Sequence, residues 1–407
     1  RFPSTFGPGL RLLDNLPIVP KHKLESALRA GTFAKAWPTT MAPEDEVGLG
    51  PFVLAEYHAG ERLVLTKNPH YWRRDAEGRT LPYLDRIVLD VVPDQNAEQA
   101  RLLAGAIDMT ADSVRPEDYA PLKRAARDGK LQLLDLGVGL TADTLWFNLK
   151  NDAFGEDPRG LWLQREELRR AISLAVDREA FANTVFLGAG VPVFGPETPA
   201  NRAWYAAPDP LPTYNPDGAR ALLMALGLKP DANGTMVDKN KTPARFTILT
   251  VKGNTALERG ATVVRDSMRP LGIGIDVVAL EQPAIIQRFL SGQYDAVYFP
   301  IVPTDTDPAV NLDFWLSRGS AHMWNMGEGA EPTEWESRID DLMQRQAGSR
   351  DLAERKRLYG EVQQVFAEHL PMLYFVAPRI YVAASARVTN LNPAVPRPQL
   401  LWSADTL

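Results

Sequence analysis

The sequence predicts an α/β fold with mixed sheets flanked by helices, and three observations support this class. Between residues 245 and 302, extended apolar runs alternate with helical patterns in the order β-α-β-α-β, which predicts parallel strands joined by right-handed crossovers. The 407 residues are enough for two or three domains at about 150 residues each. Hydrophobic residues make up 45% of the chain and charged residues 24%, which is the composition of a folded globular protein.

The first 110 residues predict a small sheet and one capped helix. Residues 50–66 form two extended segments around a turn at 59–61, which predicts a hairpin. A further strand is expected at 86–92 and a short one at 107–110. Between them, Asp94 is placed to cap a helix that ends before Gly105. The expected inner face of this helix carries Ala97, Ala100 and Leu103.

The middle of the chain predicts two amphipathic helices. Residues 163–176 place an apolar stripe on one side, with Glu166 four residues before Arg170 as a surface pair. The second helix begins at Asn215-Pro216 and ends at Gly227. The stripe of the first consists of Leu168, Ile172, Ala175 and Val176, and the buried side of the second of Leu222, Leu223 and Leu226. A tight turn follows at Asn233-Gly234.

The β-α-β-α-β block has strands at 246–251, 273–280 and 294–302. The helix between the first two strands stops at Pro270, and Pro283 stands in the first turn of the next helix. Two later helices are indicated by their apolar spacing, the second of which ends before Pro371, and a strand returns at 372–376. Their apolar positions are Trp335, Ile339, Leu342 and Met343 in one, and Leu358, Val362, Val365 and Phe366 in the other.

Composition excludes several classes of function. The net charge is −6 without a basic block, so we expect no nucleic-acid partner. There is no Cys, and the five His are scattered, so we expect no metal centre and no cofactor. No apolar run reaches the roughly 18 residues that a membrane span needs. The chain begins with Arg1 and without a basic-then-apolar stretch, so a signal peptide is predicted to be absent or removed.

Polar residues at the carboxyl ends of the three strands indicate a ligand site. In open parallel sheets, ligands meet this edge, and here the sequence has the segments 252–254, 281–282 and 303–308. Tyr298 lies on the third strand, and Thr304 and Asp305 follow it. Trp315 and Trp324 come next and could offer aromatic surface beside a carboxylate. The alternatives are that the Asp-Thr-Asp-Pro run is only a capped turn and that the Trp side chains belong to the core.

Patterns of catalytic and metal-binding residues leave two alternatives open. One alternative is that Asp305 with Asp307 or Glu281 forms the paired carboxylates of a hydrolase, which need a set separation. Calcium could bind Asp305 and Asp307, but the interlaced ligands and Gly of a twelve-residue loop are missing. The sequence has no dinucleotide fingerprint, no phosphate-binding Lys loop, no nucleophile elbow and no zinc-protease helix.

A set of short segments resembles the family 5 extracellular solute-binding proteins, the receptors of peptide, dipeptide and nickel ABC importers. The segments occur in the family's order across nearly the whole chain, which makes the set specific. They are Gly50-Pro51-Phe52, Glu61-Arg62-Leu63-Val64-Leu65, Asn68-Pro69-His70-Tyr71-Trp72, Pro82-Tyr83-Leu84-Asp85-Arg86-Ile87, Ala104-Gly105-Ala106-Ile107-Asp108, Phe147-Asn148-Leu149, Leu168-Arg169-Arg170-Ala171-Ile172, Asp177-Arg178, Tyr214-Asn215-Pro216, Ala221-Leu222-Leu223 and Ser291-Gly292-Gln293-Tyr294-Asp295.

The resemblance implies a two-lobed, type II periplasmic-binding-protein architecture that closes on its ligand. Lobe I is expected at 1–145 plus 372–407 and lobe II at 146–371, with the site between them. Family members begin with further strands of the first lobe, whereas this chain opens close to the segment that follows them, residues 17–22 here. Lobe I is therefore expected to be N-terminally incomplete. The implied partners are a small peptide-like or other organic solute and the membrane permease of an ABC importer. The implied state is a periplasmic or extracellular monomer, with a lipid anchor left open.

The expected ligand-binding residues combine the strand-end argument with the resemblance. Asn148, Tyr298, Thr304 and Asp305 are expected to orient the ligand by hydrogen bonds, and Trp146, Trp315 and Trp324 to supply apolar surface. Peptide-binding relatives carry an Asp and, in some cases, an Arg where this sequence has Thr304 and Tyr298. An ordinary peptide is therefore disfavoured, as is nickel. A hydrolase and a regulatory or scaffolding domain are the alternative functions.

Overall fold

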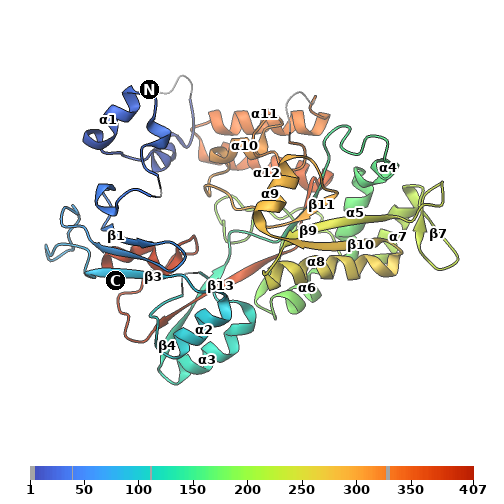
Figure 1. Ribbon diagram of the computed structural model, residues 1–407. Coiled ribbons are helices and arrows are strands. Elements are labelled where there is room, and N and C mark those ends of the chain that lie inside the picture. The colour runs from blue at the N-terminus through green and yellow to red at the C-terminus, as the bar shows by residue number, and fades with distance from the viewer. Residues whose placement is uncertain (1–4, 39, 111, 327–330) are drawn as a thin grey trace. The chain divides into compact units, whose positions relative to one another are not determined.

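The computed structural model describes residues 5–38, 40–110, 112–326 and 331–407 (Figure 1). The chain divides into two compact units, unit 1 with Arg1–Leu12 and Val138–Arg379, and unit 2 with Leu13–Gly137 and Ile380–Leu407. These borders differ from the expected lobe borders at 146 and 371, because the strands next to those positions pair within the sheet of unit 1. The assignment of the units as lobes I and II stays a prediction.

Unit 1 contains the larger sheet and most of the helices. Its strands are β5 (Thr144–Phe147), β6 (Gly190–Pro192), β7 (Lys229–Pro230), β8 (Met236–Val237), β9 (Arg245–Val251), β10 (Gly274–Leu280), β11 (Ala296–Tyr298) and β12 (Met372–Tyr374). Its α-helices are α4 (Gly160–Leu163), α5 (Glu166–Ala175), α6 (Arg178–Val185), α7 (Pro216–Ala225), α8 (Thr255–Met268), α9 (Gln282–Leu290), α10 (Leu312–Trp315), α11 (Glu334–Gly348) and α12 (Leu352–His369). Strand β13 (Val376–Ser385) continues from unit 1 into unit 2.

The central sheet of unit 1 has the strand order β10-β9-β11-β5-β12. Both β10 and β11 run parallel to β9, which confirms the predicted β-α-β-α-β block, whereas β5 is antiparallel to β11 and β12. The third strand is much shorter than the expected 294–302. After Tyr298, the amide of Phe299 donates to the carbonyl of Thr144 and the carbonyl of Phe299 accepts from the Thr144 hydroxyl. The ladder stops there because Pro300 has no N–H to continue it.

Side chains alternate between two cores on opposite faces of this sheet. Phe147, Ile248 and Tyr298 lie in the core that includes α5, α6, α7 and α8. Trp146 and Leu249, one residue away, lie in the core that includes α9, α11 and α12. Figure 1 shows α6 and α8 on one side of β9 and β10, and α11 and α12 on the other. Alternate side chains of the strands are therefore buried on both faces of the sheet. The loops at the strand ends remain as the place for a ligand site.

The predicted helices form, with small shifts at their ends. The helix expected over 163–176 begins only at Glu166, because Arg165 is extended and separates it from α4. Its stripe is buried, and Glu166 pairs with Arg170 at 2.5 Å. Asn215 caps α7 by accepting a hydrogen bond from the amide of Gly218. Helix α12 ends at His369, and Leu370 takes a left-handed conformation before the chain returns as β12.

Gly260 on α8 packs against Tyr298. A Cβ at this position would lie 2.2 Å from the Tyr298 hydroxyl oxygen. We therefore expect Gly260→Ala to lower the free energy of unfolding by about 2 kcal/mol, because the overlap forces the helix away from the sheet. A Cβ on Gly360 of α12 would have no atom within 4 Å, so Gly360→Ala is expected to stabilise by up to about 1 kcal/mol. Urea denaturation of both variants checks this, and equal shifts would contradict it.

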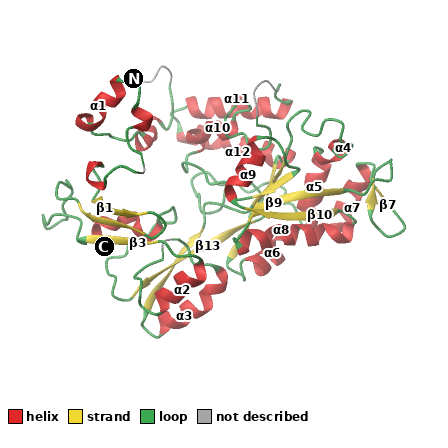
Figure 2. Cartoon of the chain, in the orientation of Figure 1, coloured by secondary structure: helices red, strands yellow, loops and turns green. Residues whose placement is uncertain are grey.

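Unit 2 contains two further β structures (Figure 2). Strands β1 (Phe52–His58), β2 (Arg62–Lys67) and β3 (Arg86–Asp90) form an antiparallel sheet, which confirms the predicted hairpin. Helices α2 (Gln95–Leu103) and α3 (Tyr119–Arg127) pack with β4 (Leu131–Val138) and β13. Helix α1 (Lys21–Arg29) precedes them, and the 3-10 helix η7 (Gln399–Thr406) ends the chain. Asp405 on η7 accepts hydrogen bonds from Tyr71 and Arg73.

Two expectations for unit 2 need correction. Asp94 caps α2 as predicted, but the buried side chain of this helix is Leu102, and Leu103 is exposed. The strand expected at 107–110 is a single bridge between Met109 and Ala384, because only one residue of this segment pairs with β13. Among the described residues, no helix is long and apolar enough to cross a membrane.

Candidate functional site

The carboxyl ends of β9, β10 and β11 in unit 1 carry the polar loops that the sequence singled out. After β9, Asn254 caps α8 by accepting from the amide of Leu257, and Gly253 donates to Glu258. Lys252 and Glu281, which follow β9 and β10, approach to 3.3 Å on the surface. These two loops are therefore built around helix starts, and the loop after β11 carries the denser polar network.

Asn311 holds the loop formed by residues 304–307. Its Oδ1 accepts hydrogen bonds from the backbone amide of Thr304 at 2.9 Å and from the Thr304 hydroxyl at 2.5 Å. Its Nδ2 donates to the carbonyl of Asp305 at 2.9 Å and to that of Asp307 at 3.4 Å. One amide side chain thus fixes both ends of the turn, so the loop is ordered before any ligand arrives.

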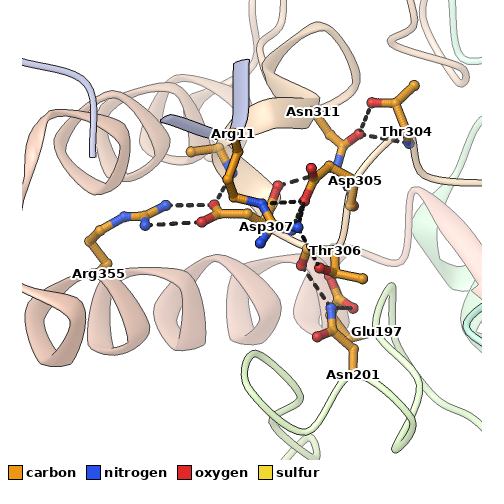
Figure 3. A network of polar contacts seen from close by, with 10 residues as sticks. Arg11, Glu197, Asn201, Thr304, Asp305, Thr306, Asp307, Asn311 and Arg355 are labelled. Carbon is orange, nitrogen blue, oxygen red and sulfur yellow. Dashed lines mark hydrogen bonds and ion pairs between the residues drawn. The ribbon is translucent and has the colours of Figure 1, made fainter. Parts of the chain in front are cut away.

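Asp305 is engaged by an arginine from the start of the chain (Figure 3). Arg11 donates from Nε to Asp305 Oδ1 at 2.9 Å, and its Nη2 lies 2.6 Å from the same oxygen. Arg11 also donates to the hydroxyl of Thr306 at 3.1 Å. The side chain of Asp305 is 9% exposed and that of Arg11 45%. The carboxylate is therefore the covered partner, and the guanidinium lies toward solvent.

Asp307 forms a buried, two-point ion pair with Arg355 of α12. Arg355 Nη2 lies 2.5 Å from Oδ1, and Nη1 lies 3.0 Å from Oδ2. Both side chains are less than a tenth exposed. Asp307 also caps the 3-10 helix η6 (Pro308–Asn311) by accepting from the amide of Ala309. The Arg355 guanidinium lies over the ring of Trp204 at 5.0 Å. The Asp-Thr-Asp-Pro run is thus a capped turn that is also tied to the helix layer.

Glu197 is the third carboxylate of this network. It accepts hydrogen bonds from the hydroxyl of Tyr359 and from Nδ2 of Asn201, both at 2.7 Å. The same Nδ2 donates to the carbonyl of Thr306 at 2.9 Å. Burial raises the pKa of Glu197 above its ordinary value, because a low dielectric disfavours the charged form.

The remaining predicted site residues lie inside unit 1. Trp315 packs edge-on against Tyr359 and Phe366, and Trp324, which is fully buried, donates from its indole nitrogen to Glu336. Trp146 is buried in the same core. Asn148 is buried and donates to the carbonyl of Gly292. The structure brings Thr304 and Asp305 together in one loop and places these four in or beside the core. Contact of any of them with a ligand stays a prediction.

Tyr298 is also fully buried, and its hydroxyl donates to Asp143 Oδ2 at 2.6 Å. Burial raises the pKa of Asp143 to about 7, and the hydrogen bond from Tyr298 opposes this rise. The backbone amide of Asp143 donates to the carbonyl of Val376, the first residue of β13, and its carbonyl accepts from the amide of Phe375. The carboxyl of Asp143, which bonds to Tyr298 of β11, is therefore largely protonated below pH 6 and ionises as the pH rises through about 7.

We expect the stability of the protein to fall as the pH rises from about 4 to about 7 through Asp143. A carboxyl whose pKa is raised by folding binds more protons in the folded state within this window, so its ionisation destabilises the fold. Asp143→Asn cannot ionise. The free energy of unfolding of the variant, compared with that of the unmodified protein, should therefore rise by about 2 kcal/mol between pH 5 and pH 8. Urea denaturation at both pH values measures this difference, and parallel pH dependences would contradict it.

Several residues of this network were not predicted from the sequence. Arg11, Glu197, Asn201 and Arg355 come from segments far from the 304–311 loop in the chain, and Asp143 stands in front of a strand without any motif. Only Asn311, four residues after Asp307, had a local signal, since Asn near a turn commonly bonds the backbone. Among the described residues, no group of His, Asp and Glu could hold a metal ion.

Comparison with known families agrees with this fold. The family model described as "Bacterial extracellular solute-binding proteins, family 5 Middle" matches residues 1–322. The chain belongs to this family. The resemblance stated from its short segments is therefore confirmed, and so is the α/β fold class of the periplasmic binding proteins.

The chain is also similar to individual binding proteins and to solved structures. The chain is 27% identical over 370 residues to a "Probable ABC transporter-binding protein" of Deinococcus radiodurans, covering 86% of this chain and 61% of the relative. It spans about three fifths of the length of the curated relatives that it matches. The structure of the oligopeptide-binding protein AppA of Bacillus subtilis in complex with a nonapeptide aligns with a TM-score of 0.75 at 24% identity, covering 99% of this chain and 74% of that one. The periplasmic binding protein MelB of Agrobacterium fabrum in complex with stachyose aligns with a TM-score of 0.74 at 22% identity, covering 95% and 60%. The two structural likenesses show the fold.

Proposed function

We propose that this chain belongs to the substrate-binding component of an ABC importer and binds a small peptide-like or other organic solute. The observation that carries the proposal is the family match over residues 1–322. The named relatives include an ABC transporter-binding protein and peptide-binding proteins. The partners would be the solute and a membrane permease, and the location periplasmic or extracellular, in line with the family description.

The loop after β11 is the part of unit 1 that we assign to the solute. Thr304 and Asp305 lie at the carboxyl end of a parallel strand, where α/β proteins place their ligands. Asn311 fixes this loop from both sides. A loop that is already ordered loses little conformational entropy on binding, which favours affinity. The buried residues Trp315 and Trp324 would support the loop through the core that includes α12, and Tyr298 would do so from the core on the opposite face of the sheet.

The hydrolase alternative loses support from the same geometry. Asp305 and Asp307 are each engaged by an arginine, whereas an acid and a base for glycosidic cleavage have to face a substrate. Glu281 is exposed and lies beside Lys252. A family of solute-binding proteins accounts for the chain without turnover.

A thermal-shift screen tests this proposal. Peptides, opines, oligosaccharides and metal complexes are added separately, and one class is expected to raise the melting temperature because it binds the folded state. Asn311→Ala is expected to weaken that ligand about tenfold, since the loop loses four hydrogen bonds. Asn240→Ala, in an exposed turn, is the matched control and should leave the shift unchanged. Absence of any shift with all classes would contradict the proposal.

A further inference from the structure

We propose that Arg11 is a specificity-determining residue of the 304–307 loop, because it pairs with Asp305 and thereby excludes ammonium and guanidinium groups of a ligand from this loop. This inference rests on the proposed function and names the kind of group that unit 1 rejects. It is carried by the Arg11–Asp305–Thr306 contact of Figure 3.

Asp305 Oδ1 is already well satisfied within unit 1. It accepts from the Arg11 guanidinium and from the backbone amide of Asp307 at 2.8 Å. A ligand cation that approaches from solvent meets the guanidinium first, because Arg11 is far more exposed than the carboxylate. The cation would therefore face a like charge, or it would have to displace Arg11 before it could bind.

The segment that carries Arg11 is fixed to unit 1. The amide of Gly7 donates to the carbonyl of Ala347 at 2.6 Å. A Cβ on Gly7 would lie 2.4 Å from the carbonyl oxygen of Ser349 and 2.9 Å from Nε of Arg355, so only Gly allows this close approach. Arg11 is thus held near Asp305 by the backbone four residues earlier, which lowers the entropic cost of the ion pair.

The other carboxylates of the network offer no replacement for Asp305. Asp307 is buried against Arg355, and Glu197 is buried with hydrogen bonds from Tyr359 and Asn201 and a raised pKa. Asp305 and Asp307 are each paired with one arginine, Arg11 and Arg355, so the charges of the two ion pairs balance. This part of unit 1 is therefore suited to an uncharged portion of a ligand.

Calorimetric titration with two matched peptides tests the inference. Tetra-alanine with a free amino terminus is compared with N-acetyl tetra-alanine, in the unmodified protein and in Arg11→Gln. The unmodified protein is expected to bind the acetylated peptide at least as tightly. In Arg11→Gln, the ratio of the two affinities is expected to shift about tenfold toward the free amine. Arg11→Met, which keeps the aliphatic stem, provides a second variant, and thermal melts check that both fold.

Two further variants separate charge exclusion from a structural effect. Asp305→Asn combined with Arg11→Gln should abolish the shift, because no carboxylate is then uncovered. Arg357→Gln, which removes a surface arginine paired with Glu354 in the same unit, should leave the ratio unchanged. An unchanged ratio in both Arg11 variants, or a preference of the unmodified protein for the free amine, would overturn the inference.

A second measurement decides the inference even if neither peptide binds, an outcome that would count against peptides under the proposed function. Methylguanidinium is titrated while the amide resonance of Asp307, which donates to Asp305, is followed by NMR. We expect a saturable shift in Arg11→Gln and none in the unmodified protein. Equal responses in the two proteins would overturn the role of Arg11 independently of the transported solute.

Discussion

Replacing Asp307 with Asn is expected to lower the free energy of unfolding by about 3–5 kcal/mol. The carboxylate forms two hydrogen bonds with Arg355 in a site from which water is nearly excluded. The amide of Asn would present a donor to the guanidinium and leave its charge buried without a partner. Urea denaturation followed by circular dichroism measures the loss.

Two controls show that burial, and not charge removal in general, causes this loss. Glu354→Gln removes an exposed carboxylate beside Arg357 on the same helix and should leave the unfolding free energy nearly unchanged. Combining Asp307→Asn with Arg355→Met removes both charges and should recover part of the stability. A double variant as unstable as the sum of the single ones would show that the pair does not couple as the geometry indicates.

Glu336→Gln is expected to lower the free energy of unfolding by about 3 kcal/mol. Its Oε1 accepts from Nε2 of His322 and from the indole of Trp324, both at 3.1 Å. Its Oε2 accepts from the amide and the hydroxyl of Thr333, both at 2.8 Å, within the capping box that begins α11. A Gln side chain has only one oxygen for these four donors, so one helix start and one buried aromatic cluster lose acceptors together.

The pH dependence of this effect follows from the same contacts. The hydrogen bonds from His322, Thr333 and Trp324 outweigh burial and lower the pKa of Glu336 to about 2. A lowered carboxyl pKa stabilises the fold above the unfolded value near 4.3 and loses that contribution as the pH falls toward 2. The gap between the unmodified protein and Glu336→Gln should thus shrink from pH 6 to pH 2.5. Glu334→Gln, two residues earlier and exposed, should show no such gap.

Local sequence patterns were sufficient for the elements whose side chains alternate cleanly. Strands β9 and β10 and the helices after them were predicted because their apolar residues recur with the periods of a strand, two residues, and of a helix, 3.6 residues. The third strand was overestimated, because its apolar run continues past the point where Pro300 ends the ladder. The segment at 107–110 failed as a strand since pairing depends on β13, which follows about 270 residues later.

The location of the candidate site could be predicted from the sequence, but the partners of its residues could not. The loop after β11 was located from its position at a strand end, but its partners were not, because Arg11 lies 294 residues before Asp305. The Trp residues were expected to offer a surface, yet Trp315 and Trp324 pack with Tyr359, Phe366 and Glu336. A Trp near a polar loop gives the same sequence signal whether it faces a ligand or the core, and only packing distinguishes the two.

Equilibrium dialysis with a solute found in the thermal-shift screen, followed by mass spectrometry of both compartments, tests the receptor assignment most directly. A transport receptor should retain one molecule of solute per chain and release it chemically unaltered after denaturation. Accumulation of a cleaved or otherwise converted product, in amounts exceeding the protein, would contradict the assignment.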